Sequence, residues 1–327
     1  MHDPVNVSIV VPCYNEEAVL AETAAQLSGL LDEMIQTGLA SPGSAVVFVD
    51  DGSKDSTWQI ISDLCVQSNR FSGIKLARNA GHQNALLAGL LTVRDTCDCA
   101  VSIDADLQDD IRAIPEMLKK FLNGSDIVYG VRSNRDTDTK FKRGTAVLFY
   151  KFMRAMGVNL VFNHADYRLM SRRALEAFSQ FSEVNLFLRG IVPLVGFPSD
   201  TVYYKRRPRF AGESKYPLKK MLSFAFDGIT SFSIAPIRLI SALGVAACLI
   251  SIAMAVYALV VKATRHAAVG WASLMVSIWF LGGVQLISVG VIGEYIGKIY
   301  KEVKRRPRFI IEACKNIASS AASKAED

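Results

Sequence analysis

The sequence has no CxxC pair, although it contains six cysteines. Only Cys97 and Cys99 lie close together, and we interpret them as ordinary thiols rather than as metal ligands or disulfide partners. The N-terminus also lacks a basic segment ahead of its first apolar run, 7–11. We therefore expect no secretory signal peptide, and we expect the large first part of the chain to stay in the cytoplasm.

Charged residues are nearly absent from residues 236–297. The mean hydropathy of +0.24 and the hydrophobic content of 50% are high for a soluble protein of 327 residues. Runs of 23 and 27 uncharged residues cover 239–261 and 267–293. Each run is long enough to cross a hydrocarbon core of roughly 30 Å as a helix. We predict a hairpin of two transmembrane helices, with a pair of buried core helices as the alternative.

Positive charge gathers on one side of this hairpin, because its tip carries only Lys262 and Arg265. The other Lys and Arg residues near the hairpin are Lys205, Arg206, Arg207, Arg209, Lys215, Lys219, Lys220, Arg238, Lys298, Lys301, Lys304, Arg305, Arg306 and Arg308. By the positive-inside rule, both termini are cytoplasmic in a multi-pass protein of the plasma (inner) membrane. The net charge of +6 then faces anionic lipid headgroups, so we expect a membrane partner and no nucleic acid.

Strand-like and helical stretches alternate over the first part of the chain. The strand-like runs are 7–11, 45–49, 73–76, 99–103, 126–129 and 200–206. The helical stretches are 16–36, 55–67, 82–94, 111–122, 146–156 and 171–195. This alternation predicts an α/β domain with a mostly parallel sheet covered on both faces. Ligands of such sheets bind beyond the carboxyl ends of the strands.

Composition divides the chain into four parts. We assign 1–210 to a cytoplasmic α/β domain, 211–235 to interfacial amphipathic helices, 236–297 to the hairpin and 298–327 to a basic cytoplasmic tail. The interfacial assignment rests on basic residues followed by recurring aromatic residues just ahead of the first span. A buried helix of the α/β domain is the alternative for that segment.

Two carboxylates follow the strand-like run 99–103, in the pentapeptide Asp104-Ala105-Asp106-Leu107-Gln108. Their i, i+2 spacing at a strand end lets both point toward one divalent cation. Oxygen ligands of this kind suit Mg²⁺ or Mn²⁺, which in turn bridges phosphate oxygens and stabilises a diphosphate leaving group. A solvated acidic turn is the alternative interpretation of this short motif.

A second acidic turn follows the run 45–49. We expect the Asp51 carboxylate to accept a hydrogen bond from a ribose hydroxyl or a base N–H, whereas Asp50 holds the turn in shape. Asp55 or Ser56 can cap the helix that follows.

The run 7–11 is followed by Tyr14, which can stack on a base, and by Asn15 and Glu16, which offer acceptors. Capping of the next helix is the alternative role of Asn15. After the third run, Arg78 supplies a cation, and we interpret His82 as a local polar contact rather than as a catalytic base.

Taken together and in order, four segments resemble the family 2 glycosyltransferases with a GT-A (Rossmann-like) fold: SIVVPCYNEE, VFVDDGSKDST, LARNAGHQNA and SIDADLQDD. Three further segments and the C-terminal hairpin resemble the polyprenyl-phosphate glycosyltransferases: ADYRLMSRRA, RPRFAGESKYPL and FAFDGITSFS. That group comprises dolichyl-phosphate mannose synthases and, more similar here, bacterial bactoprenol glucosyltransferases. The resemblance covers nearly the whole chain.

The resemblance implies a role for each matching residue. The residues that it assigns to the metal and the donor diphosphate are Asp104, Asp106 and Gln108. Those that it assigns to the rest of the donor are Pro12, Tyr14, Glu16, Asp51 and Arg78. Asp166 matches the catalytic carboxylate, and the residues expected to meet phosphates are Arg132, Arg209, Ser214 and Lys215. Within the polar loop 131–145, the roles of further cations stay open.

The resemblance implies an inverting transfer of a hexose, glucose from UDP-glucose, to undecaprenyl phosphate for cell-surface glycan modification. Alternative donors are UDP-N-acetylglucosamine, an aminosugar nucleotide and GDP-mannose, and a noncatalytic membrane scaffold is an alternative of another class. A processive polysaccharide synthase is disfavoured because the sequence has no QxxRW motif. Since a phosphate monoester is largely dianionic at pH 7, Asp166 need not act as a strong base and can orient the acceptor or stabilise positive charge at the anomeric carbon.

Glycines recur along the second apolar run at Gly283, Gly290 and Gly297, and Gly293 completes a GxxxG with Gly297. Small residues on one helix face permit close helix contact. This contact joins either the two spans of one chain or different subunits. Because members of the bactoprenol group can be tetrameric, we favour a homo-oligomer.

Overall fold

The computed structural model describes residues 3–133, 164–183, 188–205, 235–263 and 271–317. The chain forms two compact units: an α/β unit, which includes the C-terminal residues from 306 onward, and a helical unit with residues 217–305. Several predicted features lie outside the described residues: most of the loop 131–145, the helix 146–156, the interfacial segment up to 234, and Arg209, Ser214 and Lys215.

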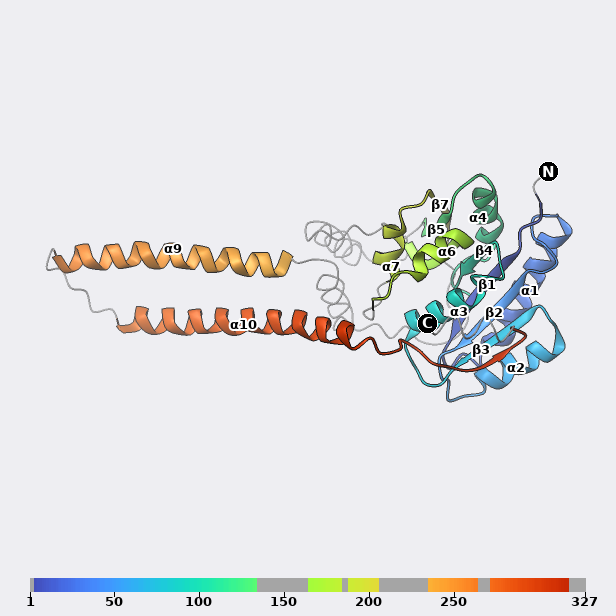
Figure 1. Ribbon diagram of the computed structural model, residues 1–327, viewed down its shortest axis with the longest axis horizontal. Helices are drawn as coiled ribbons and strands as arrows, with labels where there is room; N and C mark the ends of the chain where they lie inside the picture. The colour runs from blue at the N-terminus through green and yellow to red at the C-terminus, as the bar shows by residue number, and fades with distance from the viewer. Residues whose placement is uncertain (1–2, 134–163, 184–187, 206–234, 264–270, 318–327) are drawn as a thin grey trace. The chain divides into compact units, whose positions relative to one another are not determined.

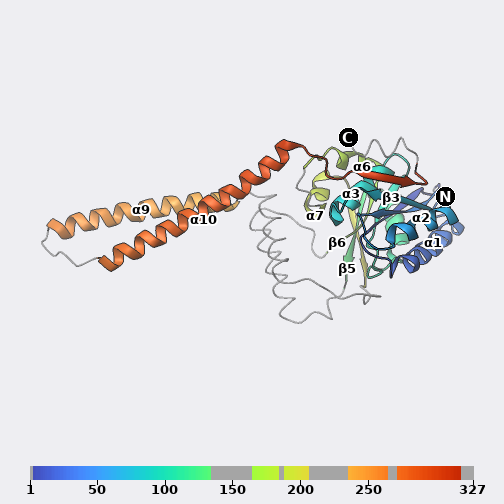
Figure 2. The same ribbon diagram turned by 90° about the horizontal axis from the view of Figure 1, so that it is seen from below.

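An eight-stranded mixed sheet forms the centre of the α/β unit (Figures 1 and 2). Its strands are β1 (Val7–Cys13), β2 (Ala45–Asp50), β3 (Phe71–Leu76), β4 (Cys99–Ser102), β5 (Ile127–Arg132), β6 (His164–Ser171), β7 (Ser199–Tyr204) and β8 (Ile311–Lys315). The spatial order is β7-β5-β6-β4-β1-β2-β3-β8. Strands β1 to β4 are parallel to their neighbours in this group, while β6 is antiparallel to both β4 and β5. The predicted α/β domain is confirmed, with four parallel and three antiparallel strand pairs in its sheet.

Helices cover both faces of this sheet. They are α1 (Leu20–Gln36), α2 (Thr57–Gln67), α3 (His82–Val93), α4 (Ala113–Leu122), α6 (Arg172–Ser179) and α7 (Leu188–Ile191), with a short 3-10 turn η1 (Val192–Val195) after α7. Because strand side chains alternate between faces, Val7, Ile9 and Val11 of β1 join the core beneath α1, α2 and α4. Val10 faces the other way, toward α3, where a Cβ added at Gly89 would overlap it. The glycine thus lets α3 lie close to the strands that carry the polar clusters.

Two strands were not among the sequence predictions. Strand β6 lies just ahead of the predicted helical stretch 171–195, in a segment for which no strand was predicted. The helix that follows it, α6, covers only Arg172–Ser179. The segment 298–327 was expected to be a basic tail, yet it contains β8, which pairs with β3 at the edge of the sheet. The side chain of Asn316 anchors this strand by donating to the carbonyl oxygens of Cys65 and Phe71 at 2.7 and 2.9 Å.

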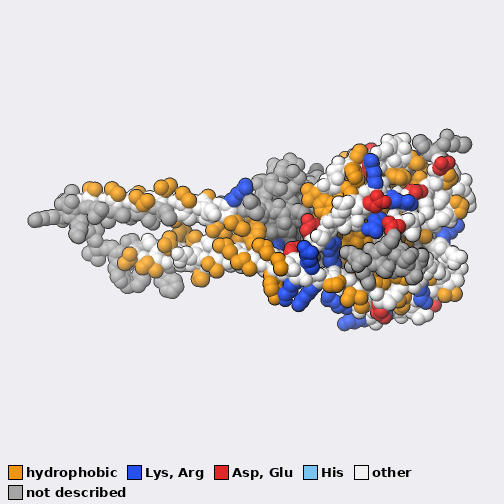
Figure 3. Space-filling model, viewed as in Figure 1, with side chains coloured by type: hydrophobic (Ala, Val, Ile, Leu, Met, Phe, Trp, Pro, Cys, Tyr) orange, Lys and Arg blue, Asp and Glu red, His pale blue; other side chains and the backbone are white. Residues whose placement is uncertain are grey.

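The helical unit contains two long helices that pack against each other, α9 (Ala235–Ala263) and α10 (Trp271–Lys304). Apolar side chains lie exposed along both helices (Figure 3). Among the described residues, one helical segment, 280–304, has the length and hydropathy needed to cross a membrane, and a shorter apolar helical stretch covers 236–247. The helix over the predicted second span therefore continues past 293, to Lys304.

The glycines of α10 do not mediate a close helix contact in this structure. A Cβ added at Gly283, Gly290, Gly293 or Gly297 would meet no atom within 4 Å. The glycine face is thus not used against α9 in the part of the chain that is described. Assembly into an oligomer stays a prediction.

Candidate functional site

The loops that follow β1 and β2 hold each other by hydrogen bonds at the carboxyl edge of the sheet. Asn15 donates from its backbone N–H to Ser53 Oγ at 3.0 Å, and its side-chain oxygen accepts from the N–H of Lys54 at 2.9 Å. The N–H of Glu16 donates to Thr57 Oγ1 at 2.9 Å. Asn15 therefore fastens the neighbouring loop and does not cap α1, which begins four residues later than predicted, at Leu20.

Asp51 fixes a third loop, the one between β3 and α3. Its two carboxylate oxygens accept from the backbone N–H groups of Ala80 and Gly81 at 2.6 and 3.0 Å. The side chain is buried, and this burial raises its pKa against the lowering effect of the two hydrogen bonds. Next to it, Gly52 has a φ of +67°, and a Cβ there would lie 2.7 Å from the backbone carbonyl carbon of Arg78. Both residues therefore set the position of the loop that leads to His82.

Asp50 and Asp55 have the structural roles expected from the sequence: the first holds its turn and the second caps the next helix. Asp50 Oδ1 accepts from the N–H of Ser53 at 3.1 Å, which holds the turn. Its Oδ2 has no hydrogen-bond partner among the described residues, and burial raises the pKa of this carboxyl. Asp55 accepts from the N–H and the hydroxyl of Thr57, so it caps the start of α2.

His82 and two carboxylates from different strands meet at this edge. His82 is the first residue of α3, Asp104 follows β4, and Asp166 lies in β6. His82 Nε2 is 3.5 Å from Asp104 Oδ1 and 3.9 Å from Asp166 Oδ2. The sequence interpretation of His82 as a polar contact agrees with these distances, although it did not identify the partners.

The surroundings of Asp104 favour the protonated form of its carboxyl group. Burial raises its pKa to about 6, and the charges of Asp109, Asp166 and Asp106 add to the rise, while His82 opposes it. Several carboxylates close together in partly buried surroundings repel one another. A cation placed among them would relieve this repulsion.

The residues predicted to hold a metal share one short loop. Asp106 Oδ1 accepts from the N–H of Gln108 at 3.2 Å, and Leu107 between them has a φ of 55°. No group of three or more His, Cys, Asp or Glu side chains within the described ranges is arranged to hold a metal ion. Two carboxylates, together with ligand phosphate oxygens and water, still match the donor set that Mg²⁺ and Mn²⁺ take. The loop therefore fits an ion that is bound together with a diphosphate.

Asp166 is held by two arginines. Its Oδ1 is 2.6 Å from Arg168 Nη2, and its Oδ2 is 3.2 Å from Arg189 Nη2. Burial would raise the pKa of Asp166, but the charges of Arg189 and Arg168 outweigh burial and hold this pKa well below its usual range. Arg168 is only 2% exposed, whereas Arg189 on α7 is 35% exposed. The two arginines thus favour the ionised form of Asp166.

Sequence reasoning missed both of these arginines. Arg168 is two positions after Asp166, and this spacing puts two side chains on one face whenever the segment is a strand. That signal was present but depended on recognising β6. Arg189 lies in a different element, α7, and no local pattern links it to Asp166.

The remaining predicted site residues either lie around the same edge of the sheet or fall outside the residues that the structure describes. Tyr14 and Arg78 are exposed at the ends of β1 and β3, whereas Pro12 is buried within β1 and paired with Val49 of β2. Arg132 ends β5 and is 3.4 Å from Asp109, a buried carboxylate that the sequence predictions did not include. The predicted acceptor residues Arg209, Ser214 and Lys215 are outside the described part of the chain.

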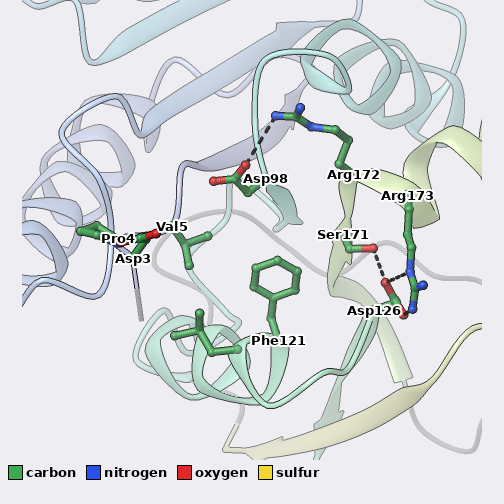
Figure 4. Close-up of a pocket in the computed structure, with 10 residues that line it drawn as sticks. Asp3, Pro4, Val5, Asp98, Phe121, Asp126, Ser171, Arg172 and Arg173 are labelled. Atoms are coloured by element: carbon green, nitrogen blue, oxygen red, sulfur yellow. Dashed lines mark hydrogen bonds and ion pairs between the residues drawn. The ribbon is translucent and has the colours of Figure 1, made fainter. Parts of the chain in front are cut away.

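A cavity of about 490 Å³ opens at the opposite edge, where β1, β4 and β5 begin (Figure 4). Four of its charged side chains form two pairs: Arg172 with Asp98 at 3.5 Å, and Arg173 with Asp126. Asp126 also accepts from the hydroxyl of Ser171. This cavity is therefore separate from the carboxylate edge, and its two arginines are paired with carboxylates.

Two family matches cover most of the chain. Residues 8–178 match the family described as Glycosyl transferase family 2, and residues 235–299 match the GtrB C-terminal hairpin. The chain is 54% identical over 305 residues to an uncharacterized glycosyltransferase, YkoT, of Bacillus subtilis, spanning 93% of this chain and 90% of that protein. It is 40% identical over 314 residues to the bactoprenol glucosyl transferase of Shigella phage SfX, spanning 94% and 99%.

Two solved structures match the chain at lower sequence identity. Glucosyl-3-phosphoglycerate synthase from Mycobacterium tuberculosis is 17% identical, with a TM-score of 0.44 over 70% of this chain and 79% of that one. The mannosyltransferase PcManGT from Pyrobaculum calidifontis is 16% identical, with a TM-score of 0.44 over 92% and 87%.

Proposed function

Because the chain belongs to glycosyltransferase family 2 and ends in a GtrB-type hairpin, we propose that it transfers a hexose from a nucleotide sugar to a polyprenyl phosphate at the cytoplasmic face of the membrane. The donor is UDP-glucose and the acceptor is undecaprenyl phosphate. The observation that carries this proposal is the meeting of Asp104, His82 and Asp166 at the carboxyl edge of the sheet. Relatives of nearly the same length are named bactoprenol glucosyl transferases, which supports transfer of glucose to a bactoprenol acceptor.

The donor lies along the ends of β1, β2 and β4 in this proposal. Tyr14, which is 41% exposed, stacks on the base. Asp51 contributes mainly through the loop 78–81, since both of its oxygens already accept backbone N–H groups. The diphosphate faces Asp104, Asp106 and Gln108, where Mg²⁺ or Mn²⁺ would neutralise charge on the leaving group.

The transfer needs no strong base. An oxygen of the acceptor phosphate forms a bond to the anomeric carbon as the bond from that carbon to the donor diphosphate breaks, so a single displacement inverts the configuration. The acceptor phosphate is largely dianionic at pH 7, because its second pKa is near 6. Asp166 is an unsuitable proton acceptor, since Arg168 and Arg189 lower its pKa. We assign it the task of holding Arg189 beside the reacting phosphates.

Positive charge is the main contribution of the side chains around Asp166. Two arginines against one carboxylate leave a net charge of +1 in this group. Such a group attracts phosphate oxygens, and guanidinium can bind them bidentately. Stabilisation of positive charge at the anomeric carbon by Asp166 is correspondingly weaker than it would be for an unpaired carboxylate.

We propose that the hairpin holds the transferase domain at a membrane. The apolar segment 280–304 anchors the chain, and the Lys and Arg bias puts both termini on the cytoplasmic side. An acceptor with a long apolar tail is then available at the headgroup level. A homo-oligomer, such as a tetramer, is compatible with the open glycine face of α10.

A transfer assay tests the proposal directly. Full-length protein in detergent is mixed with undecaprenyl phosphate, Mn²⁺ and one radiolabelled donor at a time: UDP-glucose, UDP-N-acetylglucosamine or GDP-mannose. We expect labelled lipid with UDP-glucose, and none after EDTA is added. Label from another donor would overturn the assignment of glucose. A failure to bind or transfer every donor tested, with Mn²⁺ present and the protein folded, would favour a noncatalytic scaffold.

A further inference from the structure

Arg132 and Tyr204 are neighbours across two parallel strands. Arg132 is the last residue of β5, Tyr204 is the last residue of β7, and they are paired in register. Paired residues on adjacent strands project from the same face of the sheet. The tyrosine ring is buried against Tyr167 in an edge-to-face contact, with ring centroids 5.2 Å apart. The hydroxyl of Tyr204 is therefore presented at a fixed place beside Arg132.

A buried carboxylate completes the group. Tyr204 Oη donates to Asp109 Oδ1 at 2.6 Å and accepts from Arg132 Nε at 3.3 Å. Arg132 Nη2 also donates to Asp109 Oδ1 at 3.4 Å. Burial and the Asp109 carboxylate raise the pKa of Tyr204, so its hydroxyl remains a donor. The three side chains form a closed triangle of contacts.

These contacts use only one side of the Arg132 guanidinium. Guanidinium carries five N–H donors in a planar fork, and the contacts above engage Nε and Nη2. The end of the fork, formed by Nη1 and the second hydrogen on Nη2, has no hydrogen-bond partner in the part of the chain that is described. The side chain is 29% exposed, so this end can reach a ligand. It has the geometry that binds two oxygens of one phosphate.

Asp109 also ties this arginine to the loop with the predicted metal ligands. It follows Gln108 directly, and the next residue, Asp110, accepts a hydrogen bond on its carbonyl oxygen from Tyr167 Oη at 3.0 Å. Two tyrosines in edge-to-face contact thus hold residues 109 and 110. The position of Arg132 and the position of the 104–108 loop are set by the same contacts.

We propose that Asp109 and Tyr204 are positioning residues that hold Arg132 with the open end of its guanidinium toward a phosphate of one of the two reactants. This inference rests on the proposed transfer reaction. Tyr204 does not touch the reacting atoms. Its hydroxyl removes rotational freedom from a long side chain that would otherwise have to become ordered when the ligand binds.

The test is a double-mutant cycle on the full-length protein. Tyr204→Phe keeps the ring but removes the hydroxyl, and hydrogen bonds that involve a charged group give an expected loss of roughly 10- to 100-fold in kcat/KM. Tyr203→Phe is the matched control, because it removes an exposed hydroxyl one position earlier, and we expect it to leave kcat/KM unchanged. If Tyr204 acts through Arg132, adding Tyr204→Phe to Arg132→Ala should change kcat/KM by less than about twofold.

The kinetic constants identify which phosphate Arg132 meets. A rise in KM for undecaprenyl phosphate alone indicates the acceptor, and a rise in KM for the nucleotide sugar alone indicates the donor. An equal loss of kcat/KM on adding Tyr204→Phe to the wild-type protein and to the Arg132→Ala variant would overturn the inference, as would unchanged kinetics of Tyr204→Phe. A lowered unfolding midpoint with additive losses would indicate a structural role only. Wild-type protein without any transfer would instead refute the proposed reaction, so the two failures are distinguishable.

Discussion

Replacement of Asp166 by Asn should destabilise the protein strongly, apart from any effect on turnover. The carboxylate lies 2.6 Å from the guanidinium of Arg168, whose side chain is 2% exposed. Removing one partner of a buried ion pair costs about 3–5 kcal/mol, because the other charge is left buried and unpaired. Asn keeps one acceptor oxygen, so we expect the lower end, about 3 kcal/mol. For a domain of this size, that corresponds to a fall of roughly 6–12 °C in the unfolding midpoint.

Thermal unfolding of the purified protein in detergent measures this loss, and two variants separate its causes. Arg189→Ala removes the more exposed partner while Arg168 stays paired, so its unfolding midpoint should fall much less. Asp166→Asn combined with Arg168→Met removes both buried charges. Because buried ion pairs can be replaced by apolar side chains at little cost, this double variant should regain stability relative to Asp166→Asn.

The pattern of stability and turnover decides the role of Asp166. If Asp166→Asn unfolds at the wild-type temperature and yet loses transfer, the carboxylate acts on the reactants and the ion-pair reasoning is wrong. If Arg189→Ala loses transfer while it keeps its stability, the assigned role of Asp166 as the support of Arg189 is upheld. Activity of Asp166→Asn alone cannot make this distinction, since a destabilised protein also loses turnover.

Three further predictions concern the loops at the same edge. Asp106→Asn should sharply lower lipid labelling while membrane insertion is intact, and unchanged turnover would refute the metal site. The pKa of Asp104 is raised to about 6, so protons compete with Mn²⁺ as the pH falls through this value, and calorimetry should find weaker Mn²⁺ binding at pH 5.5 than at pH 7.5. Without metal, the native state binds this proton more tightly than the unfolded chain, so this group's contribution to stability falls as pH rises from about 4 to about 6. Gly52→Ala should lower the free energy of unfolding by about 1–3 kcal/mol more than Gly38→Ala and should weaken donor binding. Both glycines have a positive φ, but only a Cβ at Gly52 would press on the backbone of Arg78. Equal losses of unfolding free energy in the two variants would exclude this contact.

The parallel half of the sheet could be predicted from the sequence because its strands are buried on both faces. The run 7–11 falls within β1 and is apolar except for Ser8, and 45–49 falls within β2 as an uninterrupted apolar stretch. Buried parallel strands have this composition, and the acidic turns that end them mark their carboxyl ends. The edge that holds Asp51 and Asp104 was therefore predictable before any coordinates.

Strand β6 could not be recognised by the same rule. Its sequence, HADYRLMS, includes two charged side chains that are almost completely buried, Asp166 and Arg168. A local pattern treats such residues as exposed, since buried charges are rare unless they are paired. The pairing partner becomes apparent only when the segment is known to be a strand. For β8, five residues at a sheet edge gave too short a pattern to distinguish from a tail.

The insertion of β6 between β4 and β5 determines the charge balance of the whole edge. Asp166 adds a negative charge near Asp104, but this charge is paired with Arg168 of the same strand and with Arg189 of α7. Asp109 is similarly engaged by Arg132. Burial raises the pKa of Asp104 to about 6, and the neighbouring carboxylates add to this rise, so the negative charge around this residue is not fully balanced. In the proposed reaction, a divalent cation would therefore bind favourably beside Asp104.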